Sequence, residues 1–333
     1  MAMMYTTAFH TGSLAKYAFL VTGGAGFIGS HLVEYLVTHQ AGKVRILDDF
    51  STGFEANIKP FLHLPQVELV RGSITDPAIC VQACQGIDFV LHQAALGSVP
   101  RSVADPATTN SVNITGFLNM LVAAHSARVK RLVFAGSSSV YGDHPALPKH
   151  EAHIGTPLSP YAVTKRTNEL YAQAFARCYQ MEIIGLRYFN IFGPRQNPQG
   201  PYAAVIPLFL RACQQGNPPV IFGDGQQSRD FTFVANAVQG NIKALFAPQT
   251  ACGQMFNIAC GERTSLNDLL SMIGSITQQP LQAIYQAERN GDIPHSLANI
   301  EAARQQLGYS PTHQVDEGLA LTWRWFKKEM VES

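Results

Sequence analysis

The sequence predicts an α/β fold in which a doubly wound parallel sheet is followed by a smaller C-terminal α/β lobe. Between Tyr17 and about Leu186, short β-branched and apolar runs alternate with longer helical patterns, as expected of a parallel sheet with helices on both faces. A glycine-rich turn at residues 23–29 joins the first apolar run directly to the first helical pattern. After Asn190 the alternation gives way to segments rich in Gly, Pro and Gln, which are typical of loops around a ligand.

The expected elements follow these patterns in order. The strands of the first domain are YAFLVT, KVRIL, VELV, IDFVLH, KRLVFA and EIIGLR, with crossover helices that include residues 27–39, 112–127 and 161–179. Beyond them, FTFV and MFNIA are strand candidates, and helices are expected near residues 266–275, 299–307 and 315–328. We therefore divide the chain into an extension or vector-derived remnant at 1–16, a first domain at 17–189 to which residues of about 230–260 return, and a second lobe made mainly of 190–333.

The composition indicates a large interior and excludes several classes of protein. Only 14% of the 333 residues are charged, against about 25% in typical soluble domains, and the net charge is +1. A nearly neutral chain without long basic runs is a poor match for a nucleic acid, and no apolar run approaches the ~18 residues of a membrane span. The first residues also lack the pattern of a secretory signal.

The cysteines and histidines favour structural roles over metal binding. The six cysteines fit neither a metal-ligand spacing nor a disulfide framework, so we expect reduced thiols in a cytoplasmic protein. His92, His144 and His295 form no ligand cluster in the sequence. No metal site is therefore predicted.

The first glycine-rich turn predicts a dinucleotide site. Gly23, Gly26 and Gly29 permit a tight turn, a close approach of a pyrophosphate to backbone N–H groups, and close packing of the helix on the strand. Asp48 ends the next strand, 19 residues after Gly29. In a Rossmann-type domain a carboxylate at this place would bind the ribose hydroxyls of the dinucleotide. Because Asp48 and Asp49 would repel a 2′-phosphate, the sequence favours NAD over NADP.

A tyrosine and a lysine four residues apart form a candidate acid–base pair. Tyr161 and Lys165 lie on one face of the expected helix 161–179. A tyrosine with a pKa near 10 is a poor base at neutral pH, but a neighbouring ammonium and a nicotinamide cation favour its phenolate. Ser137 begins a serine run after the strand KRLVFA, at the carboxyl edge of the sheet where ligands bind.

Several motifs together resemble the extended short-chain dehydrogenase/reductase family. They are the glycine motif, the Asp48-Asp49 pair, His-Gln-Ala-Ala at 92–95, Ser-Ser-Ser-Val-Tyr-Gly at 137–142, the Tyr161/Lys165 pair and Arg-Tyr-Phe-Asn at 187–190. The resemblance runs from about residue 17 to the C-terminus. It implies that Tyr161 is the catalytic base, that Lys165 lowers its pKa and holds the nicotinamide ribose, and that Ser137 binds the sugar hydroxyl.

The same resemblance implies a set of NAD-binding residues. Asp is usual at position 73 in the family, and Ser73 here replaces that carboxylate near the adenine with a hydroxyl. The implied set is Gly23, Gly26, Phe27, Ile28, Gly29, Asp48, Asp49, Ser51, Thr52, Gly53, Ser73, Ile74, Gln93, Ala94, Ala95, Asn110, Tyr161, Lys165 and Tyr188.

The residues after Ser137 discriminate among the reactions of the family, which includes epimerases, 4,6-dehydratases, decarboxylases and reductases. Dehydratases carry an Asp-Glu pair directly after the catalytic hydroxyl, which serves the elimination of water, whereas this chain has Ser138 and Ser139. Ser138 is equally compatible with simple packing at a strand end. Without a carboxylate the simplest chemistry is 4-epimerisation, in which the oxidised sugar turns over and receives the hydride on its other face.

The substrate implied by the resemblance is a UDP-sugar with an acetamido group. Arg229 and Arg289 match diphosphate-binding arginines, and the small Ser296 stands where a bulky residue would block a 2-acetamido group. The implied substrate-binding set is Gly97, Ser98, Ser137, Ser138, Ser139, Asn190, Gln196, Ala204, Val205, Arg229, Arg289, Asp292 and Ser296. We expect interconversion of UDP-N-acetylglucosamine and UDP-N-acetylgalactosamine. UDP-glucose or an acetamido uronic acid as substrate, and an inactive NAD-binding sensor, remain alternatives.

Two apolar helices, at 112–127 and 161–179, resemble those that form a four-helix bundle in dimers of the family. The apolar residues concerned could equally be buried within the monomer; they are Leu118, Leu121, Val122, Leu170 and Phe175. A homodimer is therefore the expected partnership, beside the UDP-sugar substrate.

Overall fold

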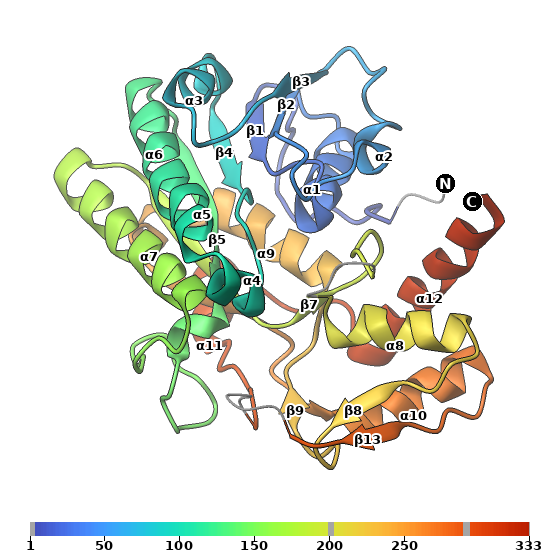
Figure 1. Cartoon of the computed structure of the whole chain (residues 1–333). Coiled ribbons are helices and arrows are strands. Elements are labelled where there is room, and N and C mark those ends of the chain that lie inside the picture. The colour runs from blue at the N-terminus through green and yellow to red at the C-terminus, as the bar shows by residue number, and fades with distance from the viewer. Residues whose placement is uncertain (1–3, 199–202, 289–293, 333) are drawn as a thin grey trace.

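The computed structural model describes residues 4–198, 203–288 and 294–332, and it confirms the predicted doubly wound sheet (Figure 1). Seven parallel strands lie in the order β11-β6-β5-β4-β1-β2-β3. Their bounds are Ala18–Thr22 for β1, Lys43–Asp48 for β2, Val67–Arg71 for β3, Phe89–His92 for β4, Arg131–Ser137 for β5, Ile183–Tyr188 for β6 and Met255–Ile258 for β11.

Helices cover both faces of this sheet because alternate strand residues point to opposite sides. On one face, Leu20, Val90 and Leu132 pack against the helices α3, α6 and α7, and on the other face Val21 and Leu91 pack in the core formed with α1 and α9. The helices of this domain are α1 (Phe27–Thr38), α2 (Glu55–Ile58), α3 (Pro77–Cys84), α4 (Val99–Ala104), α5 (Pro106–Asn110), the π-helical turn η1 (Ser111–Thr115), α6 (Gly116–Ser126), the 3-10 turn η2 (Ser138–Tyr141), α7 (Pro160–Tyr179) and α9 (Val234–Leu245).

The second lobe contains short strands in three separate pairs, with helices packed beside them. The pairs are β10 with β7, β12 with β9, and β13 with β8. Its elements are β7 (Ile191–Phe192), α8 (Val205–Gln214), β8 (Val220–Phe222), β9 (Ser228–Arg229), β10 (Thr232–Phe233), β12 (Thr264–Ser265), α10 (Leu266–Thr277), β13 (Ile284–Gln286) and α12 (Val315–Glu332). The 3-10 turn η3 (Gln249–Ala251) joins α9 to β11, and α11 (Glu301–Leu307) packs against these same two elements.

The chain crosses between the two parts of the molecule more than once. After the second lobe has begun, α9 returns to pack beside α1, and β11 then adds a strand to the main sheet next to β6. Of the helices in the described part of the chain, none is long and apolar enough to cross a membrane.

The described part of the N-terminal extension packs against the first domain. Tyr5, Phe9 and Leu14 are buried, and their contacts are with α1 and the segment that follows it. The sequence predicts residues 1–16 to be an extension or remnant before the first domain, and it does not predict this packing.

Candidate active site

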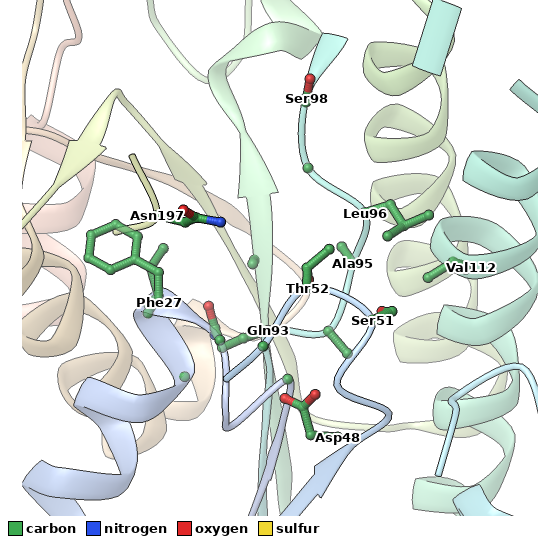
Figure 2. Close-up of a pocket in the computed structure, with 18 of the residues that line it drawn as sticks. Phe27, Asp48, Ser51, Thr52, Gln93, Ala95, Leu96, Ser98, Val112 and Asn197 are labelled. Atoms are coloured by element: carbon green, nitrogen blue, oxygen red, sulfur yellow. The ribbon is translucent and has the colours of Figure 1, made fainter. Parts of the chain in front are cut away.

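A cavity of about 730 Å³ opens at the carboxyl ends of strands β1, β2, β4 and β5 (Figure 2). Most residues predicted to bind NAD line it, namely Gly23, Gly26, Phe27, Ile28, Gly29, Asp48, Asp49, Ser51, Thr52, Gly53, Ile74, Gln93, Ala94, Ala95, Tyr161, Lys165 and Tyr188. Of the predicted substrate residues, those that line the same cavity are Gly97, Ser98, Ser137, Asn190, Gln196 and Ala204. One continuous cavity therefore joins the two predicted sites.

The glycine turn forms a backbone cradle that fits a pyrophosphate. Gly23 has a φ of +65°, and a Cβ atom on it would lie 2.8 Å from the backbone N of Ala94. A Cβ atom on Gly29 would lie 2.0 Å from the carbonyl oxygen of Gly23, so only glycine allows this packing. Gly26 precedes α1 and makes no side-chain cap, which leaves the first N–H groups of α1 to an anionic ligand.

Asp48 is held at the edge of the cavity by backbone amides. Its Oδ2 accepts a hydrogen bond from Ala25 N at 2.8 Å, and its Oδ1 accepts one from Phe50 N at 2.8 Å. Burial raises the pKa of Asp48, while the hydrogen bonds from the two amides oppose this shift. Each carboxylate oxygen keeps a further lone pair, which suits the two hydroxyls of a ribose.

Ser137, Tyr161 and Lys165 meet at the other end of the cavity. Ser137 ends β5, and the other two residues lie one turn apart on α7, so that the Lys165 Nζ is 5.9 Å from the centre of the Tyr161 ring. Burial raises the pKa of Tyr161, and a hydrogen bond with Ser137 opposes that shift. The phenolate therefore needs additional positive charge, which Lys165 and an oxidised nicotinamide can supply.

Lys165 is buried and anchored to the sheet. Its Nζ donates a hydrogen bond to the Ala135 carbonyl oxygen at 2.8 Å, and burial lowers its pKa to about 8. His92 ends the neighbouring strand β4, and its Nδ1 lies 2.9 Å from the Thr22 hydroxyl. Burial, together with the charge of Lys165, lowers the pKa of His92 to about 3, so His92 is neutral at physiological pH.

The start of α7 is fixed by two polar contacts that sequence reasoning did not identify. The backbone N of Tyr161 donates to the Ser102 hydroxyl at 3.0 Å. Asn113, in the turn η1, donates from its Nδ2 to Thr164 Oγ1 and to Leu96 O, both at 3.1 Å, and its Oδ1 accepts from Leu96 N at 2.8 Å. Asn113 thereby joins α7 to the cavity wall.

Asn110 and Asn113 lie three positions apart and differ in their surroundings. Asn110, which we predicted to bind NAD, is exposed at the end of α5 and does not line the cavity, whereas Asn113 is buried. Asn113 lies within the π-helical turn η1, which begins directly after Asn110 and changes the direction in which the side chains point.

A hydrogen-bonded group around Tyr188 contains a residue that the sequence analysis did not identify, Asn241. The Tyr188 hydroxyl donates to Gln93 Oε1 at 3.1 Å and accepts from Asn241 Nδ2 at 2.6 Å, and Gln93 Nε2 donates to Asn241 Oδ1 at 3.1 Å. Asn241 belongs to the returning helix α9, so its role could not be found from nearby residues in the sequence. The cavity also receives side chains that we did not predict, among them Phe50, Arg101, Val112 and Asn197.

Several predicted residues lie outside the lining of the cavity. The Ser73 hydroxyl accepts from Thr75 N and from Thr75 Oγ1, at 3.3 and 3.0 Å, although both neighbours of Ser73 line the cavity. The others that do not line it are Ser138, Ser139, Val205, Arg229 and Ser296. Arg289 and Asp292 lie outside the described residues.

Arg229 and Ser296 lie together in the second lobe. Ser296 N donates to Ser228 O at 3.0 Å, and Arg229 Nη1 donates to Ser228 O and Pro294 O at 3.0 and 3.2 Å. The adjacent Asp230 is fully buried, and burial raises its pKa to about 7. Its carbonyl oxygen accepts from Asn190 Nδ2 at 3.1 Å, which connects this segment to the cavity.

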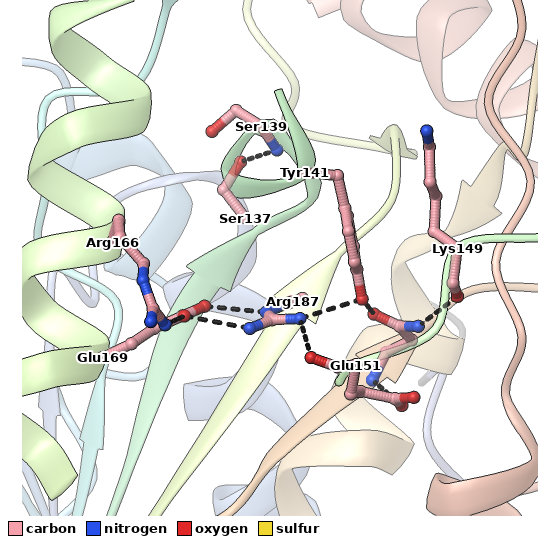
Figure 3. Close-up of polar contacts among 9 residues, drawn as sticks. Ser137, Ser139, Tyr141, Lys149, Glu151, Arg166, Glu169 and Arg187 are labelled. Atoms are coloured by element: carbon pink, nitrogen blue, oxygen red, sulfur yellow. Dashed lines mark hydrogen bonds and ion pairs between the residues drawn. The ribbon is translucent and has the colours of Figure 1, made fainter. Parts of the chain in front are cut away.

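A buried ion pair joins α7 to strand β6 of the main sheet (Figure 3). Arg187 donates from Nε and Nη2 to the two carboxylate oxygens of Glu169, at 2.7 and 3.0 Å, and both side chains are almost completely buried. Arg187 Nη1 also donates to the Tyr141 hydroxyl at 3.0 Å, and that hydroxyl donates to Asn257 Oδ1 at 2.6 Å. The helix with Tyr161 and Lys165 is thus tied to the turn after Ser137.

Comparisons with known proteins agree with this site. A model of the NAD dependent epimerase/dehydratase family matches residues 19–259. The UDP-glucose 4-epimerase of Mycolicibacterium smegmatis is 35% identical over 312 residues, which cover 93% of this chain and 98% of that protein.

Two solved structures resemble the whole fold. The UDP-N-acetylglucosamine 4-epimerase from Methanobrevibacter ruminantium M1, in complex with UDP-N-acetylmuramic acid, has a TM-score of 0.90 and 37% identity, over 94% of this chain and 99% of that chain. The UDP-glucuronic acid 4-epimerase from Bacillus cereus, in complex with UDP-glucuronic acid and NAD, has a TM-score of 0.87 and 30% identity, over 94% and 99% of the two chains.

The chain belongs to the NAD dependent epimerase/dehydratase family. More particularly, it is an NAD-dependent isomerase of the UDP-sugar 4-epimerase type, which confirms the predicted cofactor and class of reaction. The alternative of an inactive sensor is therefore not retained. In the described part of the chain, no group of three or more His, Cys, Asp or Glu residues is arranged to hold a metal ion.

Proposed function

We propose that this enzyme interconverts UDP-N-acetylglucosamine and UDP-N-acetylgalactosamine. The observation that carries the proposal is the combination of Ser137, Tyr161 and Lys165 in a cavity with small residues at its substrate end. A Cβ atom built on Gly97 meets no atom within 4 Å, so open space adjoins this residue. Such space suits a sugar that carries a 2-acetamido group.

The proposed roles follow from the geometry of the three residues. The chemistry that NAD supplies when bound is acceptance and return of a hydride at carbon 4 of the sugar. Tyr161 removes the proton of the 4-hydroxyl, Ser137 holds that hydroxyl, and Lys165 stabilises the phenolate. After the keto sugar has turned over, Tyr161 returns the proton to the new hydroxyl. Asp48 and the glycine cradle hold the adenosine and pyrophosphate parts of NAD.

An elimination reaction is less compatible with this cavity. Among the described residues that line it, the carboxylates are Asp48 and Asp49, and both stand at the end of β2 and not beside Ser137. Ser138 and Ser139 follow the catalytic hydroxyl, so no carboxyl group there can protonate a departing hydroxyl. This supports epimerisation over dehydration.

The substrate preference has a direct test. We expect kcat/KM for UDP-N-acetylglucosamine to exceed that for UDP-glucose by about 10- to 200-fold, because pocket size alone discriminates by about 1–3 kcal/mol. The assay separates the two epimers that form from each substrate, and it includes UDP-glucuronic acid as a third substrate. A Gly97→Val variant should reduce this ratio, and its turnover of UDP-glucose provides the internal control. Equal kcat/KM values for the two sugars in the parent enzyme would contradict the proposal.

We also propose a homodimer in which α6 and α7 of each subunit form a four-helix bundle. The two helices lie side by side at one edge of the molecule (Figure 1). Leu121 and Phe175 are buried within the monomer, whereas Val122 and Leu170 are each 50% exposed. The exposed pair therefore supports an interface, and the buried pair does not contribute to it.

The dimer proposal is checked by the mass of the protein in solution. Leu170→Arg places a charge at the centre of the proposed interface, so we expect a monomer by light scattering at micromolar concentration. Val81→Arg, at a similarly exposed apolar residue on α3, should leave the dimer intact. A parent protein that is already monomeric would refute the bundle.

A cytoplasmic location is proposed on the basis of the thiols. All six cysteines are unpaired, and four of them are buried, namely Cys80, Cys84, Cys213 and Cys260. Burial raises the pKa of Cys80 and Cys84 to about 12, so these thiols are unreactive. Reduced and inert thiols are typical of a reducing compartment.

A further inference from the structure

Residues 4–16, here called the N-terminal arm, are attached to α1 by aromatic and polar contacts. The Phe9 ring stacks on that of Tyr35 with centres 5.4 Å apart, and Phe9 N donates to the Tyr35 hydroxyl at 2.7 Å. His10 Nδ1 lies 2.6 Å from the same hydroxyl. Tyr5 is only 1% exposed and packs edge-on against Tyr35. The arm is thus an ordered part of the first domain.

One contact of the arm continues through the side chain of His31, on α1, to the segment after β7. The Tyr5 hydroxyl lies 2.9 Å from His31 Nδ1, and His31 Nε2 lies 3.0 Å from the Pro194 carbonyl oxygen. Burial lowers the pKa of His31 well below its usual value, so the ring is neutral. Because a carbonyl oxygen only accepts, Nε2 carries the proton and Nδ1 accepts from Tyr5.

Pro194 belongs to residues 193–197, here called the 193–197 loop, whose backbone conformation is unusual. Gly193 has a φ of +155°, and Arg195 has a φ of +66°, which is uncommon for a residue with a side chain. Arg195 forms a buried ion pair with Glu34 of α1, and Met4 N of the arm donates to the other oxygen of that carboxylate at 3.4 Å. The loop is therefore held in its conformation from α1 and from the arm.

The 193–197 loop carries two residues into the cavity. Gln196 and Asn197 both line it, as does Phe27, whose ring packs edge-on against His31 with centres 6.0 Å apart. Figure 2 shows Asn197 and Phe27 on the same side of the cavity. Gln196 Nε2 donates to Ile191 O at 3.2 Å, while its buried Oε1 has no hydrogen-bond partner in the described structure. An unpaired acceptor at a cavity wall suits a ligand that donates a hydrogen bond.

We propose that the N-terminal arm is a positioning element for substrate binding, in which Tyr5 acts through His31 and Pro194 to hold Gln196 and Asn197 ready for the UDP-sugar. The proposal rests on the proposed function for the identity of that ligand. A loop with uncommon backbone angles is not ordered by local preference, so its order depends on contacts from outside. Loss of the contact from Tyr5 would let the loop sample other conformations, and substrate binding would then have to order it again.

The test compares two variants that each remove one hydroxyl from the same aromatic cluster. Tyr5→Phe breaks the contact with His31, whereas Tyr35→Phe loosens the arm but leaves Tyr5, His31 and Pro194 in contact. Hydrogen exchange of the backbone amides of Gly193 and of residues 195–197 should be at least 10-fold faster in Tyr5→Phe than in Tyr35→Phe, as expected for a change in local opening. KM for UDP-N-acetylglucosamine should rise about 3- to 10-fold in Tyr5→Phe alone, with kcat and NAD affinity within twofold. Equal exchange and equal KM in the two variants would overturn the proposal.

A second pair of variants addresses the middle of this contact path. His31→Gln retains an N–H donor for the Pro194 carbonyl oxygen, so the amides of the 193–197 loop should stay protected from hydrogen exchange. His31→Leu lacks this donor, so the same amides should exchange faster. If His31→Leu does not fold, the comparison of the two tyrosine variants still decides the outcome. The exchange measurement needs no turnover, so it remains informative even if UDP-sugars prove not to be substrates, and a failure of the proposed function can be told apart from a failure of the positioning role.

Discussion

Tyr161→Phe is expected to lower kcat for epimerisation by roughly 10²–10⁴-fold, because the variant lacks the hydroxyl that accepts and returns the proton of the sugar. Removal of one oxygen changes neither the volume of the cavity nor the cradle of Gly23, Gly26 and Gly29. NAD affinity should therefore remain within a few-fold of the parent value. Epimer formation followed by chromatography, together with an equilibrium titration of NAD, measures both quantities.

A matched control for this result is Tyr188→Phe. Tyr188 also lines the cavity and carries a buried hydroxyl, but that hydroxyl is hydrogen-bonded to Gln93 and Asn241, whereas the Tyr161 hydroxyl is hydrogen-bonded to Ser137. We expect its loss to affect stability and cofactor binding more than the chemical step. Full turnover by Tyr161→Phe would refute the assignment of the base, and an equal loss in both variants would point to a general disturbance of the cavity.

Arg187→Leu is expected to reduce the free energy of unfolding by about 3–5 kcal/mol, because it leaves the buried Glu169 carboxylate without its main partner. Glu169 has an exposed fraction of 0%, so water cannot replace the guanidinium. The change also removes the donor to the Tyr141 hydroxyl. Urea unfolding followed by circular dichroism gives the free energy of each variant.

Arg166→Ala is the control for the ion pair, since Arg166 bonds the same carboxylate from a side chain that is 29% exposed. Its loss should cost about 1 kcal/mol or less. A double variant, Arg187→Leu with Glu169→Leu, should be less destabilised than Arg187→Leu alone, because no buried charge remains unpaired. If Arg187→Leu and Arg166→Ala cost the same, the buried pair does not have the role assigned to it.

The parts of the site that were predicted from the sequence are those set by local structure. A glycine turn between a strand and a helix, a carboxylate at the end of the next strand, and two residues one helical turn apart each require only neighbouring residues. Gly23, Asp48, Tyr161 and Lys165 therefore all line the cavity as the sequence indicates. The parallel, doubly wound class of the sheet was predicted for the same reason, since strands and crossover helices alternate along the chain.

The parts that escaped prediction depend on contacts between distant segments. Asn241 reaches Tyr188 only because α9 returns beside the sheet. Asn113 is buried within the π-helical turn η1, where it is bonded to Leu96 and Thr164, and no residue pattern indicated that turn. Tyr5 is buried through its contact with His31, 26 positions away, which the irregular pattern of residues 4–16 does not reveal.

The return of β11 to the main sheet also has a consequence for the order in which the protein forms as it is synthesised. Until residues 255–258 have left the ribosome, β6 is an open edge of the sheet, and Tyr141 lacks Asn257 as its acceptor. The catalytic turn after Ser137 is therefore completed only when more than three quarters of the chain has been made. The main sheet of the nascent polypeptide is thus completed only after synthesis of the second lobe has begun.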